Sequence, residues 1–375
     1  MDVIWRIVAG AVGASLVAWT FGAAVRTVVV PRAEPVFLTR VLFAAVRLAM
    51  WPLIRPTRPV AQRQAAMGYY APTALVLLPF QWLLFTAIGF AMLFISVGVE
   101  TWREAYGLSG SSIITLGFAN TGGDWPGTLL AFTEGAMGLV LVALLISFLP
   151  TMYGAFSSRE RMVAFLAVRA GTPPSPVEMV IRFHRLGELS NMTELFTRLE
   201  AWFDELSETH TTFLALPWFR SPNHERSWVT SAGAALDAAA LTVSTLETKR
   251  DTEAQFAIRA GYSSLREIAQ GYDLDVPADP QATDEISITR AEFDEACELM
   301  KEAGLPVLED RELAWINFSG WRVNYDASLT MLAELLVVPY GEWTSDRVLS
   351  RRPPVRVWLS LRRSRLPSRF GSPAS

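Results

Sequence analysis

Cysteine and histidine are scarce in this chain of 375 residues, and their scarcity excludes several classes of protein. The single cysteine, Cys297, has no second cysteine with which to form an intrachain disulfide. The three histidines, His184, His210 and His224, do not have the spacing of metal ligands, and the sequence contains no Gly-x-Gly-x-x-Gly phosphate-binding loop. We therefore expect no metal site, no bound cofactor and no enzyme activity.

Charge is missing from long stretches of the N-terminal half. Residues 71–99 contain no charged residue, residues 127–150 contain only Glu134, and residues 7–25 form a third apolar stretch. Because a helix needs about 20 apolar residues to cross the hydrocarbon core of a bilayer, we interpret all three stretches as membrane-spanning helices. The composition, 51% hydrophobic and 19% charged, then indicates a membrane protein with a soluble half.

Residues 36–54 are also apolar, but they carry Arg40 and Arg47. A charge at the centre of a membrane helix costs about 2.5 to 3.5 kcal/mol on insertion scales. Since the two arginines are seven residues apart, they share one face of a helix. We favour an amphipathic helix on the inner leaflet over a fourth span, and both possibilities stay open.

The arginines near the predicted spans are unevenly distributed. Residues 26–70 contain seven arginines against one acid, whereas residues 100–126 contain one arginine against three acids. Cytoplasmic loops of membrane proteins carry an excess of basic residues. We therefore place residues 31–70 and the C-terminus in the cytoplasm, and the connection between the last two spans on the outer side.

Apolar residues recur at spacings of three and four through most of residues 157–345. This pattern predicts an all-α cytoplasmic domain without a substantial sheet. Thr289 and Glu292 have the spacing of a capping box, which predicts a helix start. The predicted helices cover residues 160–170, 177–186, 192–206, 228–246, 255–270, 290–303 and 311–336.

Charge divides the cytoplasmic half into two parts. Residues 156–345 contain 30 acids and 16 bases, a net charge of −14, whereas residues 346–375 contain one acid and eight arginines, a net charge of +7. The Pro-, Ser- and Arg-rich composition of residues 346–375 predicts a basic disordered tail. We expect the tail to contact anionic membrane lipids. We expect no nucleic acid partner, because the acidic domain beside the tail would repel phosphate.

The connection between the last two predicted spans contains the sequence Ser-Gly-Ser-Ser-Ile-Ile-Thr-Leu-Gly-Phe-Ala-Asn at residues 109–120. Within it, Thr-Leu-Gly-Phe at residues 115–118 matches the first four positions of the Thr-x-Gly-Tyr/Phe-Gly filter of potassium channels, and the residues just before resemble the end of a pore helix. Residues 71–160 therefore resemble the outer helix, pore helix, filter and inner helix of the potassium-channel pore family. The segments 220–228 and 320–326 resemble bacterial membrane proteins usually called potassium-channel-like.

The resemblance implies an all-α protein of the bacterial inner membrane, with a re-entrant pore loop inside a pore domain of residues 71–156 and a separate N-terminal span within residues 1–30. A potassium-channel filter replaces the water shell of an ion with rings of backbone carbonyls. One loop supplies one quarter of such a filter, so the resemblance implies a homotetramer that conducts a monovalent cation, with potassium as the expected ion. The predicted ion-pathway residues are Thr115, Leu116, Gly117, Phe118 and Ala119.

Ala119 stands where these channels have their second glycine. An L-residue resists left-handed backbone by roughly 1 to 2 kcal/mol. We therefore expect weaker potassium selectivity, a non-selective cation pathway or a filter that does not conduct. Asp124, together with Glu134 inside the last span, is predicted to support the pore. Gly138 and Pro150 are candidates for a bend that gates it, although close helix packing is the commoner use of such a glycine and ending the span is the simpler role of the proline.

A hypothesis from another class competes with the channel. The chain would then be a membrane sensor or scaffold that does not conduct and that signals through its helical cytoplasmic domain. An apolar hairpin that only resembles a filter fits this second hypothesis. The oligomeric state in mild detergent distinguishes the two, because only the channel requires four copies.

Overall fold

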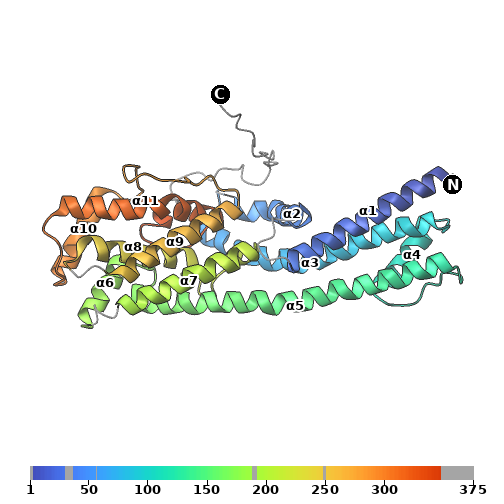
Figure 1. Cartoon of the computed structure of the whole chain (residues 1–375), viewed down its shortest axis with the longest axis horizontal. Coiled ribbons are helices and arrows are strands. Elements are labelled where there is room, and N and C mark those ends of the chain that lie inside the picture. The colour runs from blue at the N-terminus through green and yellow to red at the C-terminus, as the bar shows by residue number, and fades with distance from the viewer. Residues whose placement is uncertain (1–2, 30–36, 56, 188–191, 248–250, 348–375) are drawn as a thin grey trace, which may run out of the picture.

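The computed structural model is elongated, with a bundle of helices at one end and long helices extending from it to the other end (Figure 1). It describes residues 3–29, 37–55, 57–187, 192–247 and 251–347. Regular secondary structure within these ranges is helical, apart from an isolated antiparallel bridge between Leu246 and Val307. The prediction of an all-α protein is confirmed for this part of the chain.

Among the described residues, four helices are long and apolar enough to cross a membrane: α1 (Val3–Val28), α2 (Phe37–Ile54), α3 (Val60–Ser96) and α5 (Trp125–Ala170). Helices α1, α3 and α5 coincide with the three predicted spans and run along the long axis of the molecule (Figure 1). Helix α2 lies near the middle, where the long helices meet the helical bundle. The helix predicted at 36–54 is therefore present, and its crossing of the membrane stays an open prediction.

Helices α1 and α3 pack closely because both carry glycine at their crossing. A Cβ atom on Gly13 would lie 2.6 Å from the carbonyl oxygen of Gly89, and a Cβ atom on Gly89 would lie 2.6 Å from Cγ2 of Val17. Small residues let helix backbones approach one another in this way inside membranes. The two glycines therefore fix the pairing of the first two long helices.

The two arginines of α2 contact the helical bundle. Arg40 forms an ion pair with Asp273, with a nitrogen-to-oxygen distance of 3.7 Å. The Arg47 guanidinium lies 5.4 Å from the ring centre of Trp218. Both arginines thus have partners in the bundle. Because Arg40 and Arg47 are seven residues apart, they lie on one face of α2, and this face contacts the bundle.

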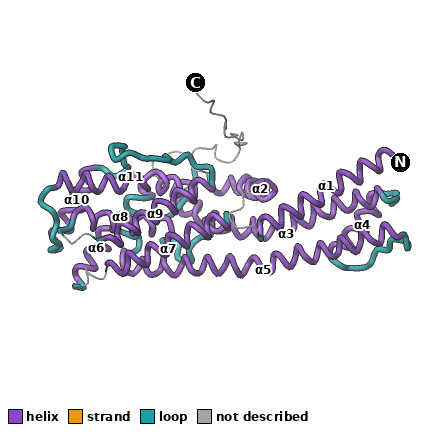
Figure 2. The backbone as a smooth tube through the Cα atoms, viewed as in Figure 1, coloured by secondary structure: helices purple, strands orange, loops and turns teal. Residues whose placement is uncertain are grey.

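A short helix and a returning loop lie at the end of the molecule far from the bundle. Helix α4 (Trp102–Ile113) begins at Thr101, whose side chain accepts a hydrogen bond from the Glu104 N–H. The chain between α4 and α5 then runs back alongside α5 without regular structure (Figure 2). This order of helix, short helix and returning loop is the order that the sequence predicts for residues 71–126.

Helix α5 connects the two ends of the molecule. Its 46 residues correspond to a length of about 69 Å, more than twice the roughly 30 Å thickness of a bilayer core. The helix continues through Pro150 to Ala170, so Pro150 does not end it. The helix thus outlasts the membrane span, and the end of the span at Pro150 stays a prediction.

The bundle consists of α6 to α11 and two short 3₁₀ segments, and the helices predicted for it are confirmed. Every residue of α8 except Val243 is buried, so α8 forms the centre of the bundle. The predicted capping box of Thr289 and Glu292 is present at the start of α10. The elements are α6 (Pro176–Arg185), α7 (Met192–Thr212), η2 (Leu216–Trp218), α8 (Trp228–Thr245), α9 (Thr252–Gly271), α10 (Arg290–Glu302), α11 (Arg311–Leu336) and η3 (Ser345–Arg347).

Two residues of the predicted basic tail are folded. Asp346 and Arg347 belong to η3, and Arg347 donates a hydrogen bond of 2.6 Å to Glu292 on α10. These two residues are thus part of the folded domain. The remainder of the predicted tail, 348–375, lies outside the described residues.

Candidate functional site

Ser111 holds the loop that follows α4. Its backbone carbonyl accepts hydrogen bonds from the N–H groups of Leu116 at 2.8 Å and Gly117 at 3.3 Å. Its hydroxyl oxygen accepts a third bond, of 3.1 Å, from the N–H group of Ala119. The neighbouring carbonyl of Ser112 accepts the Thr115 N–H at 3.0 Å. Two consecutive serines at the end of α4 therefore provide acceptors for most of the predicted filter.

The backbone of this loop alternates in handedness. Thr115 has a φ of 56° and Gly117 a φ of 71°, whereas Leu116 and Phe118 do not have positive φ angles. Glycine adopts the left-handed region freely, while a residue with a Cβ atom resists it by roughly 1 to 2 kcal/mol. That cost falls on Thr115. Ala119 does not have a positive φ, so the strain expected at Ala119 is wrong for this conformation.

The carbonyl oxygens of residues 115–118 accept no hydrogen bond from any described residue. The side chains of Leu116 and Phe118 are likewise unpacked, with 61% and 70% of their surfaces exposed. Backbone carbonyls removed from water need partners, and at membrane depth only protein or a water-filled cavity can provide them. Residues 114–118 are exposed in the single chain, so no described part of the chain covers these carbonyls.

Glu134 lies behind the loop, where it joins three helices. Its side chain is fully buried, and its Oε1 atom lies 2.5 Å from the hydroxyl of Ser109 on α4. The same hydroxyl lies 3.0 Å from the carbonyl oxygen of Ala87 on α3. A serine hydroxyl carries one hydrogen, so a second hydrogen, on the Glu134 carboxyl, is needed for both contacts to be hydrogen bonds. Sequence reasoning found Glu134 but missed Ser109, which only tertiary packing places beside it.

Gly138 and Gly135 let α5 approach the end of α4. A Cβ atom on Gly138 would lie 2.0 Å from the carbonyl oxygen of Ile113, and one on Gly135 would lie 3.2 Å from that of Ser112. Close packing, the commoner use of such a glycine, thus accounts for Gly138. Its predicted role as a gating bend receives no support from this contact.

Asp124 supports the loop as the N-cap of α5. Its carboxylate accepts a hydrogen bond of 3.2 Å from the Gly127 N–H. The hydroxyls of Thr121 and Thr128, 2.9 Å apart, tie the returning loop to the first turns of the same helix. The structure therefore holds both ends of the loop: the serines of α4 before it and the α5 cap after it.

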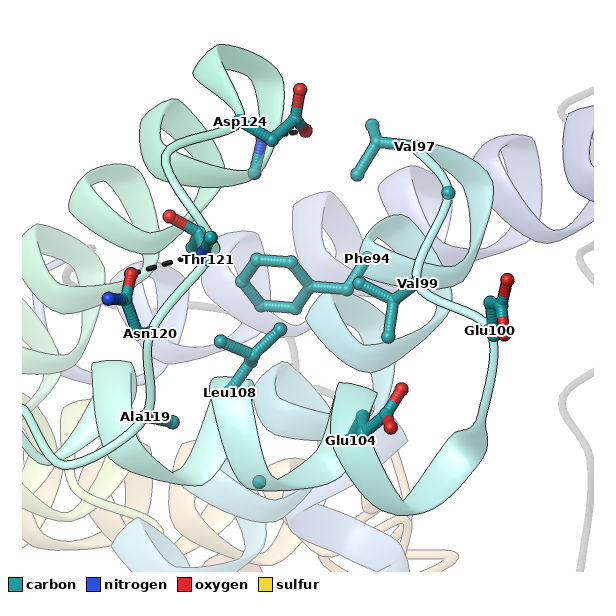
Figure 3. Close-up of a pocket in the computed structure, with 14 residues that line it drawn as sticks. Phe94, Val97, Val99, Glu100, Glu104, Leu108, Ala119, Asn120, Thr121 and Asp124 are labelled. Carbon is teal, nitrogen blue, oxygen red and sulfur yellow. Dashed lines mark hydrogen bonds between the residues drawn. The ribbon is translucent and has the colours of Figure 1, made fainter.

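A cavity of about 560 Å³ opens beside the outer end of this loop. The turn after α3, the first half of α4 and residues 119–127 surround it. The side chains of Phe94 and Leu108 lie between these walls, and Glu100 and Glu104 lie on the side away from Asn120 (Figure 3). Sequence reasoning did not predict a cavity here, because its walls come from three separate segments.

The bundle contains a buried charged cluster that sequence reasoning also missed. Arg322 donates hydrogen bonds of 2.6 Å to both carboxylate oxygens of Asp237, and further bonds of 2.7 Å to Asp326 and to the Trp343 carbonyl. Tyr325 donates a bond of 2.8 Å to Asp237. Burial alone would lower the pKa of the Arg322 guanidinium, but the two carboxylates outweigh burial and raise it. The spacing of four between Arg322 and Asp326 was the one signal in the sequence.

His210 is buried where α5 enters the bundle. Its Nε2 atom lies 3.5 Å from Nη1 of Arg159, a residue of α5 that also donates hydrogen bonds to the carbonyls of Leu216 and Phe219. Burial lowers the pKa of His210 well below its ordinary value, and the Arg159 guanidinium lowers it further. His210 is therefore neutral at physiological pH and accepts the arginine N–H at Nε2.

The Cys297 thiol and the possible metal ligands do not form a reactive site among the described residues. Burial raises the pKa of the Cys297 thiol to about 11, so the nucleophilic thiolate is scarce at neutral pH. Within the described ranges, no group of three or more His, Cys, Asp or Glu side chains is arranged to hold a metal ion.

No protein-family model, no curated protein and no solved structure matches this chain. Its function is therefore inferred from its own residues.

Proposed function

We propose that this chain is one subunit of a homotetrameric channel for monovalent cations, with potassium as the expected ion. The observation that carries the proposal is the row of unpartnered carbonyl oxygens at residues 115–118, in a loop whose N–H groups are held by Ser111 and Ser112. Ordered carbonyls that face no donor of their own chain are what a filter needs, because the ion takes the place of the donor.

The proposed arrangement in the membrane follows the long axis of the molecule. Helices α1, α3 and α5 cross the bacterial inner membrane, the loop after α4 re-enters from the outer side, and the bundle and the C-terminus are cytoplasmic. Helix α2 lies at the inner surface, because its Arg40 and Arg47 contact the bundle. An interfacial α2 also leaves three crossings, which would put the N-terminus and the loop on the same side of the membrane. The start of α1 and the loop lie at the same end of the molecule (Figure 1).

Four copies would complete what one copy leaves open. Around a fourfold axis, the carbonyls of residues 115–118 would face one another, and the exposed Leu116 and Phe118 side chains would pack against neighbouring subunits. The Thr115 carbonyl and hydroxyl would then line the inner end of the filter.

A non-conducting sensor is the alternative, and one observation favours it. Helix α5 passes from the loop into the bundle as one unbroken element, and Arg159 fixes its inner part by buried hydrogen bonds. Such a connection can transmit a signal in either direction without conduction.

The test combines assembly and ion flux. We expect the purified chain to form a fourfold particle in mild detergent and to carry potassium flux in vesicles. Gly117→Ala should change that flux because it puts a Cβ atom at a left-handed position, and Thr115→Ala should change it because it removes the hydroxyl at the inner end of the filter. Ser111→Ala should change the potassium-to-sodium ratio, because it removes the acceptor of the Ala119 N–H.

Ser112→Ala is the matched control. Its hydroxyl donates a hydrogen bond of 2.8 Å to Leu108 within its own helix, and its backbone carbonyl is unchanged by the substitution. A stable monomer or dimer without flux at any voltage or pH would contradict the channel and favour the sensor.

A further inference from the structure

The cavity beside the outer end of the loop has apolar walls and an acidic rim. Val97, Val99, Leu108 and Ala119 contribute apolar surface, and the buried side chain of Phe94 packs between the walls (Figure 3). Three acids line it, Glu100, Glu104 and Asp124, and no basic residue among the described ones does. Neither Glu100 nor Glu104 forms an ion pair with a described residue, so their charges are not neutralised within the chain.

The helix ends at the cavity do not reverse this charge. The first turns of α4 and α5 contribute to the lining through Glu104 and Gly127, and a helix N-terminus carries about half a positive charge. Two such ends, together with Arg103 in the first turn of α4, amount to about two positive charges against three carboxylates. The potential in the cavity is therefore negative, and an anion would be repelled.

The placement of the acids and the size of the cavity favour an organic molecule over a chelated metal ion as the occupant. No three acidic side chains converge closely enough in the described chain to hold a metal. Figure 3 shows Glu100 and Glu104 on one side of the opening and Asp124 on another, with Phe94 and Leu108 between them. A cavity of about 560 Å³ also falls in the size range of pockets for small organic molecules.

We propose that this cavity binds an organic ammonium cation from the outer side, with its hydrocarbon part against Val97, Val99 and Leu108 and its charge near Glu104. Ala119 and Asn120 line the same cavity, so the bound cation contacts the outer end of the loop. The site goes beyond the proposed channel, because its lining comes from one copy of the chain and binding requires no conduction.

Saturation-transfer NMR with the full chain in zwitterionic nanodiscs tests the proposal, with benzyltrimethylammonium as the probe and empty nanodiscs as the blank. We expect saturable binding that Glu104→Gln weakens by about fivefold, the factor that corresponds to an exposed ion pair of about 1 kcal/mol. Benzyl alcohol, which has the ring without the charge, should bind more weakly, and benzenesulfonate should not bind.

Two glycines of α4 provide a matched steric pair. A Cβ atom on Gly107 or on Gly110 meets nothing within 4 Å, and Gly107 lines the cavity whereas Gly110 does not. Gly107→Leu should abolish binding by filling the cavity, while Gly110→Leu should leave the affinity unchanged.

Equal affinity in Gly107→Leu and wild type would overturn the proposal, as would equal binding of benzyl alcohol or no saturable binding at all. If either leucine variant fails to assemble, the double variant Glu100→Gln with Glu104→Gln decides instead, since an unchanged affinity there contradicts the site. Binding to a protein without ion flux would support the site while the channel fails.

Discussion

Gly138 offers the sharpest test of how the loop is held. A Cβ atom there would lie 2.0 Å from the Ile113 carbonyl oxygen. Cβ atoms in proteins essentially never come within 3.0 Å of a non-bonded heavy atom from another part of the chain. Gly138→Ala must therefore push the end of α4 away from α5 by about 1 Å. Because Ile113 is the last residue of α4, that displacement reaches the loop directly.

The expected magnitude has two opposing parts. Overpacking of this kind costs about 1 to 3 kcal/mol, and replacing a helical glycine by alanine returns up to about 1 kcal/mol. Gly154→Ala, in the same helix, meets nothing within 4 Å and should only gain stability. Gly135→Ala, at 3.2 Å from the Ser112 carbonyl oxygen, should fall between the two.

Unfolding by titration with SDS, followed by tryptophan fluorescence, measures the three variants side by side. From most to least stable, we expect the order Gly154→Ala, Gly135→Ala, Gly138→Ala. The free energies of unfolding of the first and the last should differ by about 1 to 3 kcal/mol. Amide hydrogen exchange should also rise at residues 111–119 in Gly138→Ala alone. Equal stabilities for Gly138→Ala and Gly154→Ala, with unchanged exchange, would refute the close contact between α4 and α5.

Two further predictions concern the bundle. Burial lowers the pKa of His210 on folding, so the unfolded chain binds its proton first as the pH falls, and the free energy of unfolding should decrease from pH 7 to pH 5. His210→Gln should remove that part of the pH dependence in denaturant titrations, and the exposed His224→Gln should not; identical pH profiles would contradict the neutral His210. Asp237→Ala should cost about 3 to 5 kcal/mol, because it leaves the buried Arg322 with fewer partners. Glu312→Ala, which breaks an exposed ion pair with Arg290, should cost less than about 1 kcal/mol. Thermal unfolding measures both variants, and equal losses of stability in Asp237→Ala and Glu312→Ala would contradict the role of burial.

The order and type of the helices could be read from the sequence. Apolar runs of membrane length located α1, α3 and α5, and apolar spacings of three and four located α6 to α11. The signals are local, because a helix satisfies its backbone within itself and exposes its pattern along a short stretch of chain. The Thr289 capping box is local in the same sense, and it was predicted correctly.

The loop was only partly predictable. The motif at residues 115–118 identified the segment, yet the positive φ at Thr115 and its absence at Ala119 depend on the acceptors that Ser111 and Ser112 provide. A motif carries residue types but not hydrogen-bond partners. The strain was therefore assigned to Ala119 when the fold places it at Thr115.

What the sequence by itself determined is the set of helices, the likeness of one loop to a filter and the acidic character of the soluble half. Only the tertiary structure decided that Ser109 joins Glu134, that Gly138 serves packing, that Arg322 pairs with Asp237 and that three segments enclose a cavity. The physical reason is distance along the chain. Contacts between residues 25 to 85 positions apart depend on how whole helices pack, and no local pattern of residues records that packing.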